Sequence, residues 1–549
     1  MKKVRWIVLA LVVVLAAALA VGCAGQKKSA DADTTGTGKP IDTIKIGLGG
    51  DPASTDPAFA YDYTNNPPCN QISESLLKYD YEDQLQPYLC ESWEEVDPLT
   101  YVYNVRSNVT FSDGTPMTME DVLYSIERYR DPDIASYLMW MYDSVDTIEQ
   151  TGDWQFTVKL QTADALWKHT FATTAGHILQ KAYCEEVGDK LGKPGTGTIG
   201  TGAYVIESWD PGSQMTLTYN PSYWNAAEEG EPDVKTLIFQ FIEEDSTRVM
   251  AAASKQIDIN VSTPVDMKSD IDKAEGVELR KFPSAGLTFL AFNCRKAPFD
   301  DVNVRRAIAS ALDLASIQEN IVKDYGEPTN WMALPATMFT FEKESWEAFE
   351  ASDRIVKYEY NIEKAKEYLA QSSKPDGFKC TLMVDSTSTF QSMGLAIQQT
   401  LKEIGIEVEL WKVTNVEAVD YEFGKDIDDK GIRPYDMGLY EWFSDFPDPS
   451  GDLVPIFKST NAGAGGSNTS CLDNKDVDKL LDEQAQLSDD AKRTELMQDA
   501  LNIITDQIPL VVMDHPNYLI SVSDNVKEVN FDPFWIWNFY VKDFKMATK

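Results

Sequence analysis

The chain has 549 residues, of which 43% are hydrophobic, so it is long enough to form two or three domains with sizeable cores. Its formal net charge of −39 at pH 7 argues against nucleic acid as a partner, because binding phosphates requires concentrated Lys and Arg. With three histidines and no metal-ligand motif such as CxxC or HExxH, we also expect no structural metal and no cofactor.

The first 22 residues have the organisation of an export signal peptide. A basic start, MKKVR, precedes an apolar stretch at 6–21 that is shorter than a typical transmembrane helix. The small residues that lead to Cys23 resemble a lipobox, the bacterial lipoprotein signal, although Ala20 stands where Leu is usual. This resemblance implies cleavage before Cys23 and acyl chains, palmitate among them, that hold the protein on the outer face of the cell membrane. The alternative is an ordinary cleaved signal peptide.

Residues 23–43 are predicted to be a flexible tether, because they are rich in small and polar residues and have no apolar period. The alternation at 44–48 predicts the first strand, and the string NQISESLLKYD at 70–80 predicts a short amphipathic helix. Six further cysteines are scattered singly, which leaves open whether they form disulfides or stay reduced: Cys69, Cys90, Cys184, Cys294, Cys380 and Cys471.

Residues 85–130 hold the most informative string, LQPYLCESWEEVDPLTYVYNVRSNVTFSDGTPMTMEDVLYSIERYR. Alternation at 101–106 predicts a strand, the Gly and Pro of 112–116 predict a turn, and Thr118 is placed to cap a helix with acidic residues in its first turn. Locally this is one more strand–turn–helix of an α/β protein. As a whole, however, the string resembles the signature of extracellular solute-binding proteins of the peptide- and nickel-binding family, which deliver ligands to ABC importers.

Several later strings support the same resemblance. Residues 195–200, GTGTIG, match the dinucleotide-binding pattern GxGxxG, but a strand is predicted after them instead of a helix, so we assign no nucleotide site. The longer string at 200–224 resembles instead the family's G-T-G-x-Y…N-x-x-Y-W pattern. The strings at 297–313 and 358–369 are also similar to family patterns; in the first we expect Arg305 to cap or brace a helix, and in the second we expect Asn361 to cap one. Lys255 stands where the family's G-x-I-D strand has Gly.

Alternating strand and helix patterns between 382 and 410 predict a second α/β unit. Helices are further predicted at 245–254, with Asp245 or Ser246 as N-cap, and at 477–504. The resemblance implies a bilobal α/β fold of the periplasmic-binding-protein type, with an extra subdomain inserted in the first lobe. We therefore expect the following division: lobe I from 44–70, 200–285 and 515–549, the inserted subdomain from 71–199, and lobe II from 286–514.

The string YDMGLYEWFSDFPDP at 435–449 is the predicted ligand-binding segment. It runs from a strand into an aromatic and acidic loop, and loops that follow strand ends are where such folds bind ligands. It resembles the W-x-x-D-x-x-[DE]-P segment of peptide-binding members, and this resemblance implies that Asp445 pairs with the α-ammonium group of a peptide. We also expect ligand contacts from Tyr440, Trp442 and Phe443, although Trp442 would serve equally as a core residue and Asp445 as a turn cap.

One departure from the family concerns the type of ligand. Oligopeptide-binding members carry an Arg three residues before this Trp, and Leu439 occupies that place here, which weakens a specific match to that branch. The aromatic string FDPFWIWNF at 531–539 fits either packing of the closing segment or lining of a cleft, and we favour packing.

The resemblance implies a solute-binding protein and not an enzyme. Ligand would enter a cleft between two hinged lobes and shift the population towards a closed form, and a monomer would deliver it to an ABC permease and its ATPase subunits. Peptides or other amine-bearing solutes are the expected cargo. The alternatives are nickel, haem or sugar as cargo, a surface receptor that senses peptides, and a secreted hydrolase, for which no GxSxG or metal-ligand motif is present.

Overall fold

The computed structural model describes residues 41–548, with gaps at 63, 81, 328–339, 430, 464–465, 532–533 and 535–538. The predicted signal peptide 1–22, Cys23 and the tether up to residue 40 lie outside the described residues, as does most of the aromatic string at 531–539. No helix in the described part of the chain has both the length and the apolar character needed to cross a membrane.

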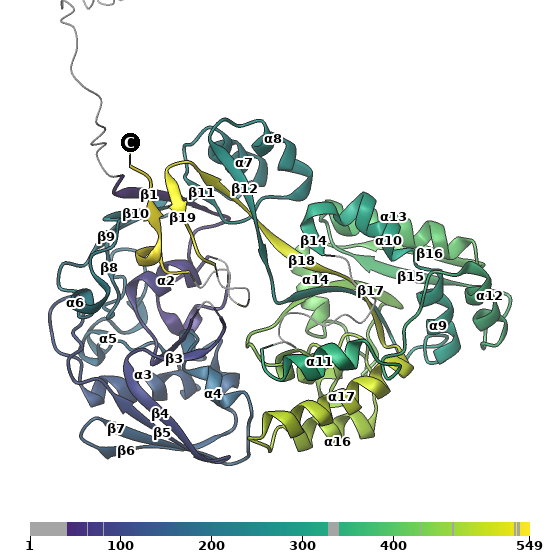
Figure 1. The fold of residues 1–549 in the computed structure, drawn as a ribbon, viewed down its shortest axis with the longest axis horizontal. Helices are drawn as coiled ribbons and strands as arrows, with labels where there is room; N and C mark the ends of the chain where they lie inside the picture. Colours follow the sequence, from purple (N-terminus) through teal and green to yellow (C-terminus); the bar gives the residue numbers. More distant parts are fainter. Residues whose placement is uncertain are drawn as a thin grey trace, which may run out of the picture. The chain divides into compact units, whose positions relative to one another are not determined.

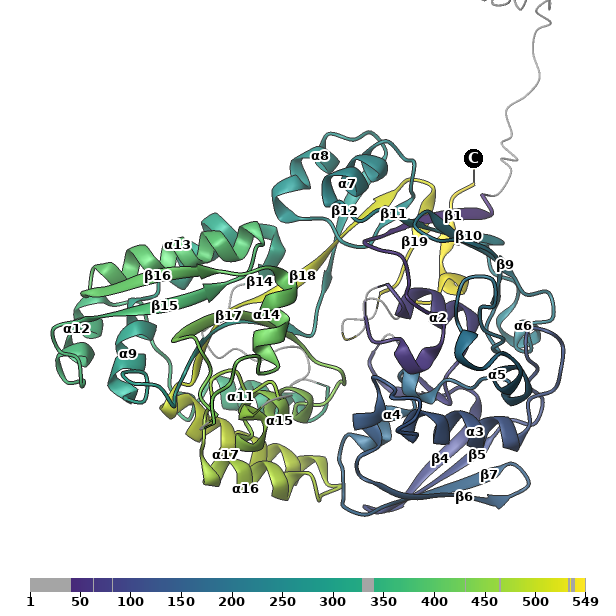
Figure 2. The ribbon, with the colours of Figure 1, turned by 180° about the vertical axis from the view of Figure 1, so that it is seen from behind.

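One twelve-stranded sheet runs through the described unit. Its strand order is β16 (Ile406–Lys412), β15 (Phe378–Val384), β17 (Met437–Phe443), β13 (Gly286–Phe292), β18 (Leu510–Ser523), β11 (Ile259–Asn260), β1 (Thr43–Leu48), β10 (Thr236–Phe241), β9 (Gln214–Tyr219) and β8 (Tyr204–Asp210). Two further strands, β12 (Val277–Pro283) and β14 (Gly326–Glu327), pair with β18. Strands β11 to β8 belong to lobe I and strands β16 to β13 to lobe II (Figures 1 and 2). The predicted first strand is confirmed as β1, and the α/β unit predicted between 382 and 410 contains β15 and β16 as a parallel pair.

Strand β18 connects the two lobes. Its residues 510–514 pair with β13 and its residues 517–523 pair with β12, so this 14-residue strand lies partly in each lobe. The second crossing is the short connection from β12 to β13, where the Ser284 hydroxyl donates to the Pro516 carbonyl. Two crossing segments of this kind are where a hinge acts in domain closure. The predicted boundary between lobe II and the last segment of lobe I, at 514 and 515, falls inside β18. The division of the chain into lobes and subdomain stays a prediction.

The segment between β1 and β8 contains a separate four-stranded sheet in the order β4 (Cys90–Asp97), β5 (Thr100–Val105), β7 (Gln155–Leu160) and β6 (Val145–Gly152). Helix α3 (Met119–Arg130) contributes buried side chains to the same core. The ring of Tyr103 stacks on that of Phe156 with centroids 5.0 Å apart, and Phe171 meets both rings edge-on. The predicted strand at 101–106 is therefore confirmed as β5, to within one residue at each end.

Thr118 caps α3 as predicted. Its hydroxyl accepts a hydrogen bond from the Asp121 N–H at 3.3 Å, and the Asp121 carboxylate accepts one from the Thr118 N–H at 2.9 Å, which makes a capping box. We expect Thr118→Ala to lower the free energy of unfolding by about 1 kcal/mol, because the Asp121 N–H of the first turn loses its acceptor. Equilibrium unfolding in urea measures this loss, and Thr118→Ser is the matched control. An equal loss in both variants would contradict the capping role.

Helices cover both faces of the lobe II strands. Helices α13 (Ser388–Lys402) and α9 (Val302–Ala311) lie on opposite sides of β15 and β16 in both views (Figures 1 and 2). Helix α12 (Ile362–Ala370) packs on α9 and is capped by Asn361 as predicted. The predicted bracing role of Arg305 is also confirmed, because this side chain is 3% exposed and donates to the carbonyls of Phe299, Gln507 and Ile508. Helices α16 (Lys475–Gln484) and α17 (Asp490–Gln507) pack on one another.

The remaining elements are short. They are α2 (Asn66–Ile72), β2 (Leu77–Tyr79), β3 (Leu85–Pro87), α4 (Trp167–Thr170), α5 (Lys181–Val187), α6 (Ala226–Glu229), α7 (Asp245–Ala253), α8 (Lys268–Asp272), α10 (Leu314–Ile317), α11 (Lys343–Glu350), α14 (Asn415–Glu422), α15 (Ser450–Phe457), β19 (Val526–Glu528) and β20 (Lys545–Met546).

The helix predicted at 70–80 is wrong. The helix is α2, which begins four residues earlier and ends at Ile72, and the chain then enters β2, which pairs with β3. Pro67 and Pro68 start α2, because the first helical turn does not use its N–H groups. Ser73 leaves the helix with an extended φ of −133°. An apolar pattern of a few residues cannot distinguish these two arrangements.

Two predictions of helix ends also need correction. Helix α7 is capped by Glu244, whose carboxylate accepts hydrogen bonds from two N–H groups of the first turn, and not by Asp245 or Ser246. The helix predicted at 477–504 is in fact α16 and α17, and Asp489 caps the second of them. The longer carboxylate of Glu244 reaches the same donors that a shorter cap would reach.

Candidate functional site

A cavity of about 560 Å³ lies between the two lobes. Its lobe I wall includes Gly49 after β1, Arg248 of α7 and residues 261–264 after β11. Its lobe II wall is formed by Tyr325, Glu441 and Phe443, and residues 516–519 of β18 close the side next to the hinge. A volume of this size is typical of sites that hold small molecules.

Strand β17 divides the predicted site residues between its two faces. Side chains alternate along a strand, so Glu441 and Phe443 face the cavity while Tyr440 and Trp442 face the core of lobe II. Tyr440 is 3% exposed and packs against Phe289. The indole N–H of Trp442 donates to Asp452 Oδ1 at 3.0 Å. Phe443 is thus placed at the cavity, and Tyr440 and Trp442 are placed behind it.

Glu441 is a cavity residue that the sequence prediction missed. The alternation that identified the strand also indicates that residues 441 and 443 share a face, and this was the available signal. The Tyr325 hydroxyl donates to the Glu441 carboxylate. Burial raises the pKa of Glu441 to about 7, and the hydrogen bond from Tyr325 opposes that rise.

Asp445 follows the end of β17 and meets lobe I. The hydroxyl of Tyr61, in the loop after β1, donates to Asp445 Oδ2 at 2.8 Å. Burial raises the pKa of Asp445 to about 7, and the hydrogen bond from Tyr61 opposes that rise. Glu422, at the end of α14, also lies near Tyr61, and burial raises its pKa to about 8. A carboxylate in such a place favours a cationic partner, which would offset the cost of its desolvation.

The loop after Asp445 is anchored in both lobes. Phe446 is buried in the core of the inserted sheet, with its ring 6.2 Å from that of Trp140. Asp448 is fully buried and accepts two hydrogen bonds from the Arg493 guanidinium, at 2.9 and 2.8 Å. Burial alone would raise the pKa of Asp448, but Arg493 holds it well below its usual range. Asp448 Oδ2 also lies 3.9 Å from Nε2 of His169, whose pKa burial lowers to about 4.

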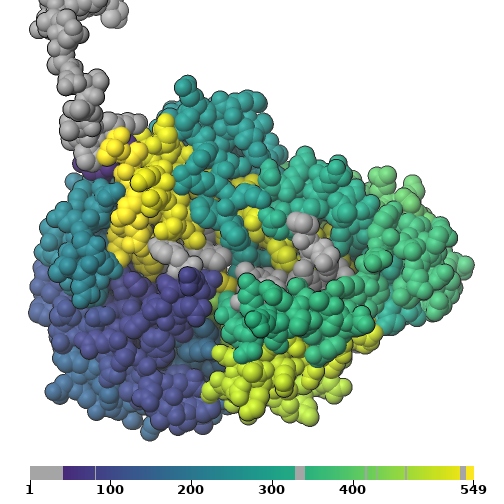
Figure 3. All heavy atoms as spheres, in the orientation of Figure 1, coloured from purple at the N-terminus to yellow at the C-terminus, as the bar shows by residue number. Residues whose placement is uncertain are grey.

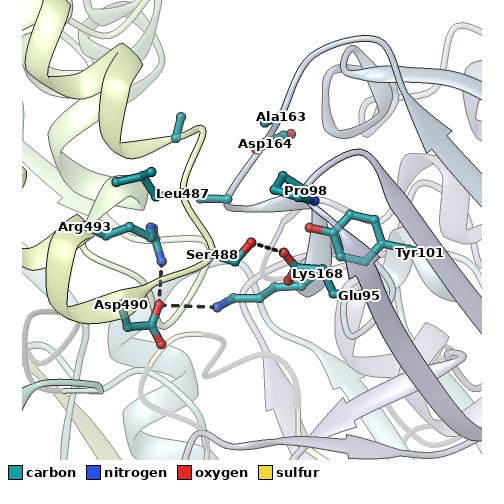
Figure 4. Close-up of a pocket in the computed structure, with 12 residues that line it drawn as sticks. Glu95, Pro98, Tyr101, Ala163, Asp164, Lys168, Leu487, Ser488, Asp490 and Arg493 are labelled. Atoms are coloured by element: carbon teal, nitrogen blue, oxygen red, sulfur yellow. Dashed lines mark hydrogen bonds and ion pairs between the residues drawn. The ribbon is translucent and has the colours of Figure 1, made fainter.

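A second contact closes the lobes at the far end of this interface. Ser488, between α16 and α17, donates to Glu95 of β4, and Lys168 of α4 lies 3.9 Å from Asp490 (Figure 4). Asp490 also contacts Arg493 at 3.2 Å. On the surface, the yellow-green helices α16 and α17 meet the purple and blue inserted sheet (Figure 3). The structure therefore has the lobes in contact on the side opposite the β18 crossing.

The histidines and cysteines occupy structural positions. His169 and His177 are 6% and 1% exposed, as expected of core residues, and burial lowers the pKa of His177 to about 3. The six cysteines that the structure describes are free. Outside the gaps, no group of three or more His, Cys, Asp or Glu side chains has an arrangement that could hold a metal ion.

Comparison with known proteins identifies the family to which the chain belongs. Residues 84–464 match the family model described as "Bacterial extracellular solute-binding proteins, family 5 Middle". The chain belongs to this family. The probable D,D-dipeptide-binding periplasmic protein DdpA of Escherichia coli (strain K12) is 27% identical over 509 residues, which cover 90% of this chain and 92% of that protein. Heme-binding protein A of Haemophilus influenzae is 27% identical over 531 residues, which cover 91% of this chain and 90% of that protein.

The fold of this solute-binding protein is also similar to solved structures. The ABC transporter-associated periplasmic binding protein DppA from Helicobacter pylori, in complex with the peptide STSA, has a TM-score of 0.74 and 22% sequence identity. The match covers 92% of this chain and 98% of the other. The predicted bilobal α/β fold and the predicted family are therefore confirmed.

Proposed function

We propose that this solute-binding protein captures small solutes with a free amine, peptides above all, in the cavity between its lobes and delivers them to an ABC permease with its ATPase subunits. The observation that carries the proposal is Asp445, a carboxylate with a raised pKa that stands at the lobe interface, held by Tyr61. An ammonium group offers this carboxylate both a charge and hydrogen-bond donors. The similarity to a probable D,D-dipeptide-binding protein and to a protein solved in complex with a peptide agrees with this cargo.

Ligand capture would work by a change in population between open and closed forms. The two segments that cross between the lobes, at 284–285 and within β18, would act as hinges. Asp445 is not itself a lining residue of the cavity, so a ligand would have to reach it from Phe443. Such a ligand would stabilise the closed arrangement, because contacts from both lobes exist only there. The closed monomer would then dock on the permease. We propose Asp445 and Phe443 as ligand contacts, with Tyr440 and Trp442 supporting them from the core side.

A panel of matched ligands tests this proposal. Ala-Ala, N-acetyl-Ala-Ala, a tetrapeptide, haem, a nickel–histidine complex and a disaccharide would each be added to the purified protein, and Kd and the melting temperature measured. We expect Ala-Ala or the tetrapeptide to raise the melting temperature and to be recovered intact after incubation. Cleavage of the peptide would favour the hydrolase alternative. Binding of haem, nickel or sugar in place of peptides would overturn the proposed cargo, and mass spectrometry of co-purified ligands would identify its replacement.

The proposed role of Asp445 predicts a dependence of affinity on pH. Because the pKa of Asp445 is raised to about 7, the carboxylate of the empty site takes up a proton as the pH falls below 7 and loses its attraction for ammonium. We expect Kd for Ala-Ala to rise about 15-fold between pH 8 and pH 5.5, because the ionised fraction of the carboxylate falls about 30-fold while the protonated fraction of the α-amine roughly doubles. Isothermal titration calorimetry measures this change, with melting curves at each pH as the control for folding. A Kd that stays constant would contradict the role of Asp445.

We also propose that Cys23 carries the lipid anchor. The sequence before Cys23 supports this, since small residues precede it directly after the apolar stretch. We expect Cys23→Ser to move the protein from the membrane fraction of the producing cells into the soluble fraction, because a protein without acyl chains has no apolar anchor. Immunoblots of the two fractions measure this. Retention of the variant in the membrane fraction would favour another mode of attachment.

A further inference from the structure

Three polar side chains form a row on one face of the sheet beside the hinge. Thr288 of β13 is paired in register with Glu441 of β17 on one side and with Asp514 of β18 on the other. Residues directly opposite in neighbouring strands have Cβ atoms about 5 Å apart and point to the same face. The row therefore brings two carboxylates together on either side of one hydroxyl, and its Glu441 end lines the cavity.

The inner carboxylate of this row lacks partners. Asp514 is 0% exposed, and neither of its carboxylate oxygens has a hydrogen bond within the described part of the chain. The Thr288 hydroxyl, also 0% exposed, faces the carboxylate closely enough to oppose the rise in its pKa, although the two groups do not have hydrogen-bond geometry. Gly326 of β14 packs so closely on the carboxylate that a Cβ at this position would lie 2.1 Å from Asp514 Oδ2. An enclosed carboxylate without hydrogen bonds costs free energy in the empty protein, and a group that supplies a positive charge would remove that cost.

The cations of the surrounding walls are already engaged. Arg248 donates to Asn260, to the Ile242 carbonyl and to Asp245. Lys281 lies 2.9 Å from Glu327, and both side chains are about half exposed. Tyr325 supplies a neutral hydroxyl to Glu441. The two carboxylates of the row thus present negative charge to the hinge end of the cavity when they are ionised.

We propose that Glu441 and Asp514 form a second cation subsite of the cavity, which selects cargo with a basic group in addition to its free amine. This inference rests on the proposed function and specifies its substrate class. Glu441 would contact the basic group directly, and Asp514 would act behind it through the shared negative charge. Burial raises the pKa of Asp514 to about 8, and the neighbouring charge of Glu441 adds to the rise, so binding of a cation would also release protons from the pair.

The spacing along the chain fits a short basic peptide. Asp445 follows Glu441 by four residues, which span at most about 13 Å of extended chain. The α-ammonium and the side-chain ammonium of a dipeptide that ends in lysine can be separated by roughly this distance or less. One carboxylate would therefore bind the α-amine while the row at the hinge binds the side chain.

Two dipeptides that differ in one charge test the inference. Ala-Lys and Ala-norleucine have side chains of similar length, and Kd of each would be measured at pH 8 for the wild type, Glu441→Gln and Asp514→Asn. We expect the wild type to bind Ala-Lys 10-fold to 100-fold more tightly than Ala-norleucine, roughly the range for a charge-assisted hydrogen bond in a buried site. Both variants are expected to lose most of this preference. Glu409→Gln, which removes an exposed charge of β16, is the matched control and should keep it.

The outcomes separate this inference from the proposed function. Equal affinities for both dipeptides in the wild type, or an undiminished preference in Glu441→Gln, would overturn the inference and leave the peptide-binding function standing. If neither dipeptide binds, the same proteins would be titrated with 1,5-diaminopentane. Binding of the diamine that is lost in Glu441→Gln would support the cation subsite and overturn the peptide cargo, whereas no binding of the diamine would overturn both. If Glu441→Gln does not fold, two other measurements test the inference: Asp514→Asn should lose most of the preference for Ala-Lys, and the wild type should lose it between pH 8 and pH 5.5. A preference that persists in both measurements would overturn the inference.

Discussion

Asp445→Asn is expected to weaken the binding of free-amine ligands about 100-fold and to leave the protein folded. The amide keeps the size of the carboxylate and can still accept the hydrogen bond from Tyr61, so the loop after β17 keeps its contact with lobe I. What is lost is the charge. A charged hydrogen bond in a desolvated site contributes about 1.5–3 kcal/mol, and an ammonium left without its counter-charge costs more, which together correspond to about two orders of magnitude in Kd.

A ligand pair makes this prediction specific. Ala-Ala should lose affinity for Asp445→Asn, while N-acetyl-Ala-Ala, which has no ammonium group, should bind both proteins equally weakly. The melting temperature of the ligand-free variant should equal or exceed that of the wild type at pH 8, because the variant no longer buries an ionised carboxylate. An unchanged Kd for Ala-Ala in a folded Asp445→Asn protein would contradict the assigned role.

Local patterns predicted much of the fold correctly. The strand β5, the cap at Thr118 and the cap at Asn361 depend on residues within a few positions of one another, and short-range physics is sufficient for them. Lys255 is instructive, because it stands where the family pattern has Gly and adopts a φ of 58°, in the left-handed region that favours Gly. The Gly of the family pattern thus indicates a left-handed backbone conformation, and the structure has this conformation at Lys255 although the residue is not Gly.

The contacts that build the site could not be predicted in the same way. Tyr61 and Asp445 are 384 positions apart, and no local pattern connects them. The row of Glu441, Thr288 and Asp514 depends on the register of three strands, which the hydrophobic pattern of each strand alone does not set relative to the others. Composition alone does not separate Tyr440 and Trp442, which face the core of lobe II, from Phe443, which lines the cavity, since aromatic residues fill cores as readily as they line clefts.

Arg493→Met is expected to lower the free energy of unfolding by about 3–5 kcal/mol, since it leaves Asp448 as an unpaired charge in the core. The side chains of Arg493 and Asp448 are 1% and 0% exposed and are joined by two hydrogen bonds. Asp448 lies three residues after Asp445, so the same change should also loosen the loop that carries the proposed ligand contact. Equilibrium unfolding in guanidinium, followed by tryptophan fluorescence and by circular dichroism, measures the loss and shows whether the lobes unfold together.

A comparison with an exposed ion pair and with the double variant identifies the cause. Arg306→Met removes a pair with Asp506 at 2.9 Å, whose side chains are 25% and 53% exposed, and should cost no more than about 1 kcal/mol. Asp448→Asn combined with Arg493→Met should be less destabilising than Arg493→Met alone, because no unpaired charge then remains in the core. If Arg493→Met were no worse than Arg306→Met, burial of the pair would not determine its contribution. If the double variant lost as much as the two single changes together, Asp448 and Arg493 would act independently, and the attachment of this loop would have to depend on Phe446 and its packing in the core of the inserted sheet.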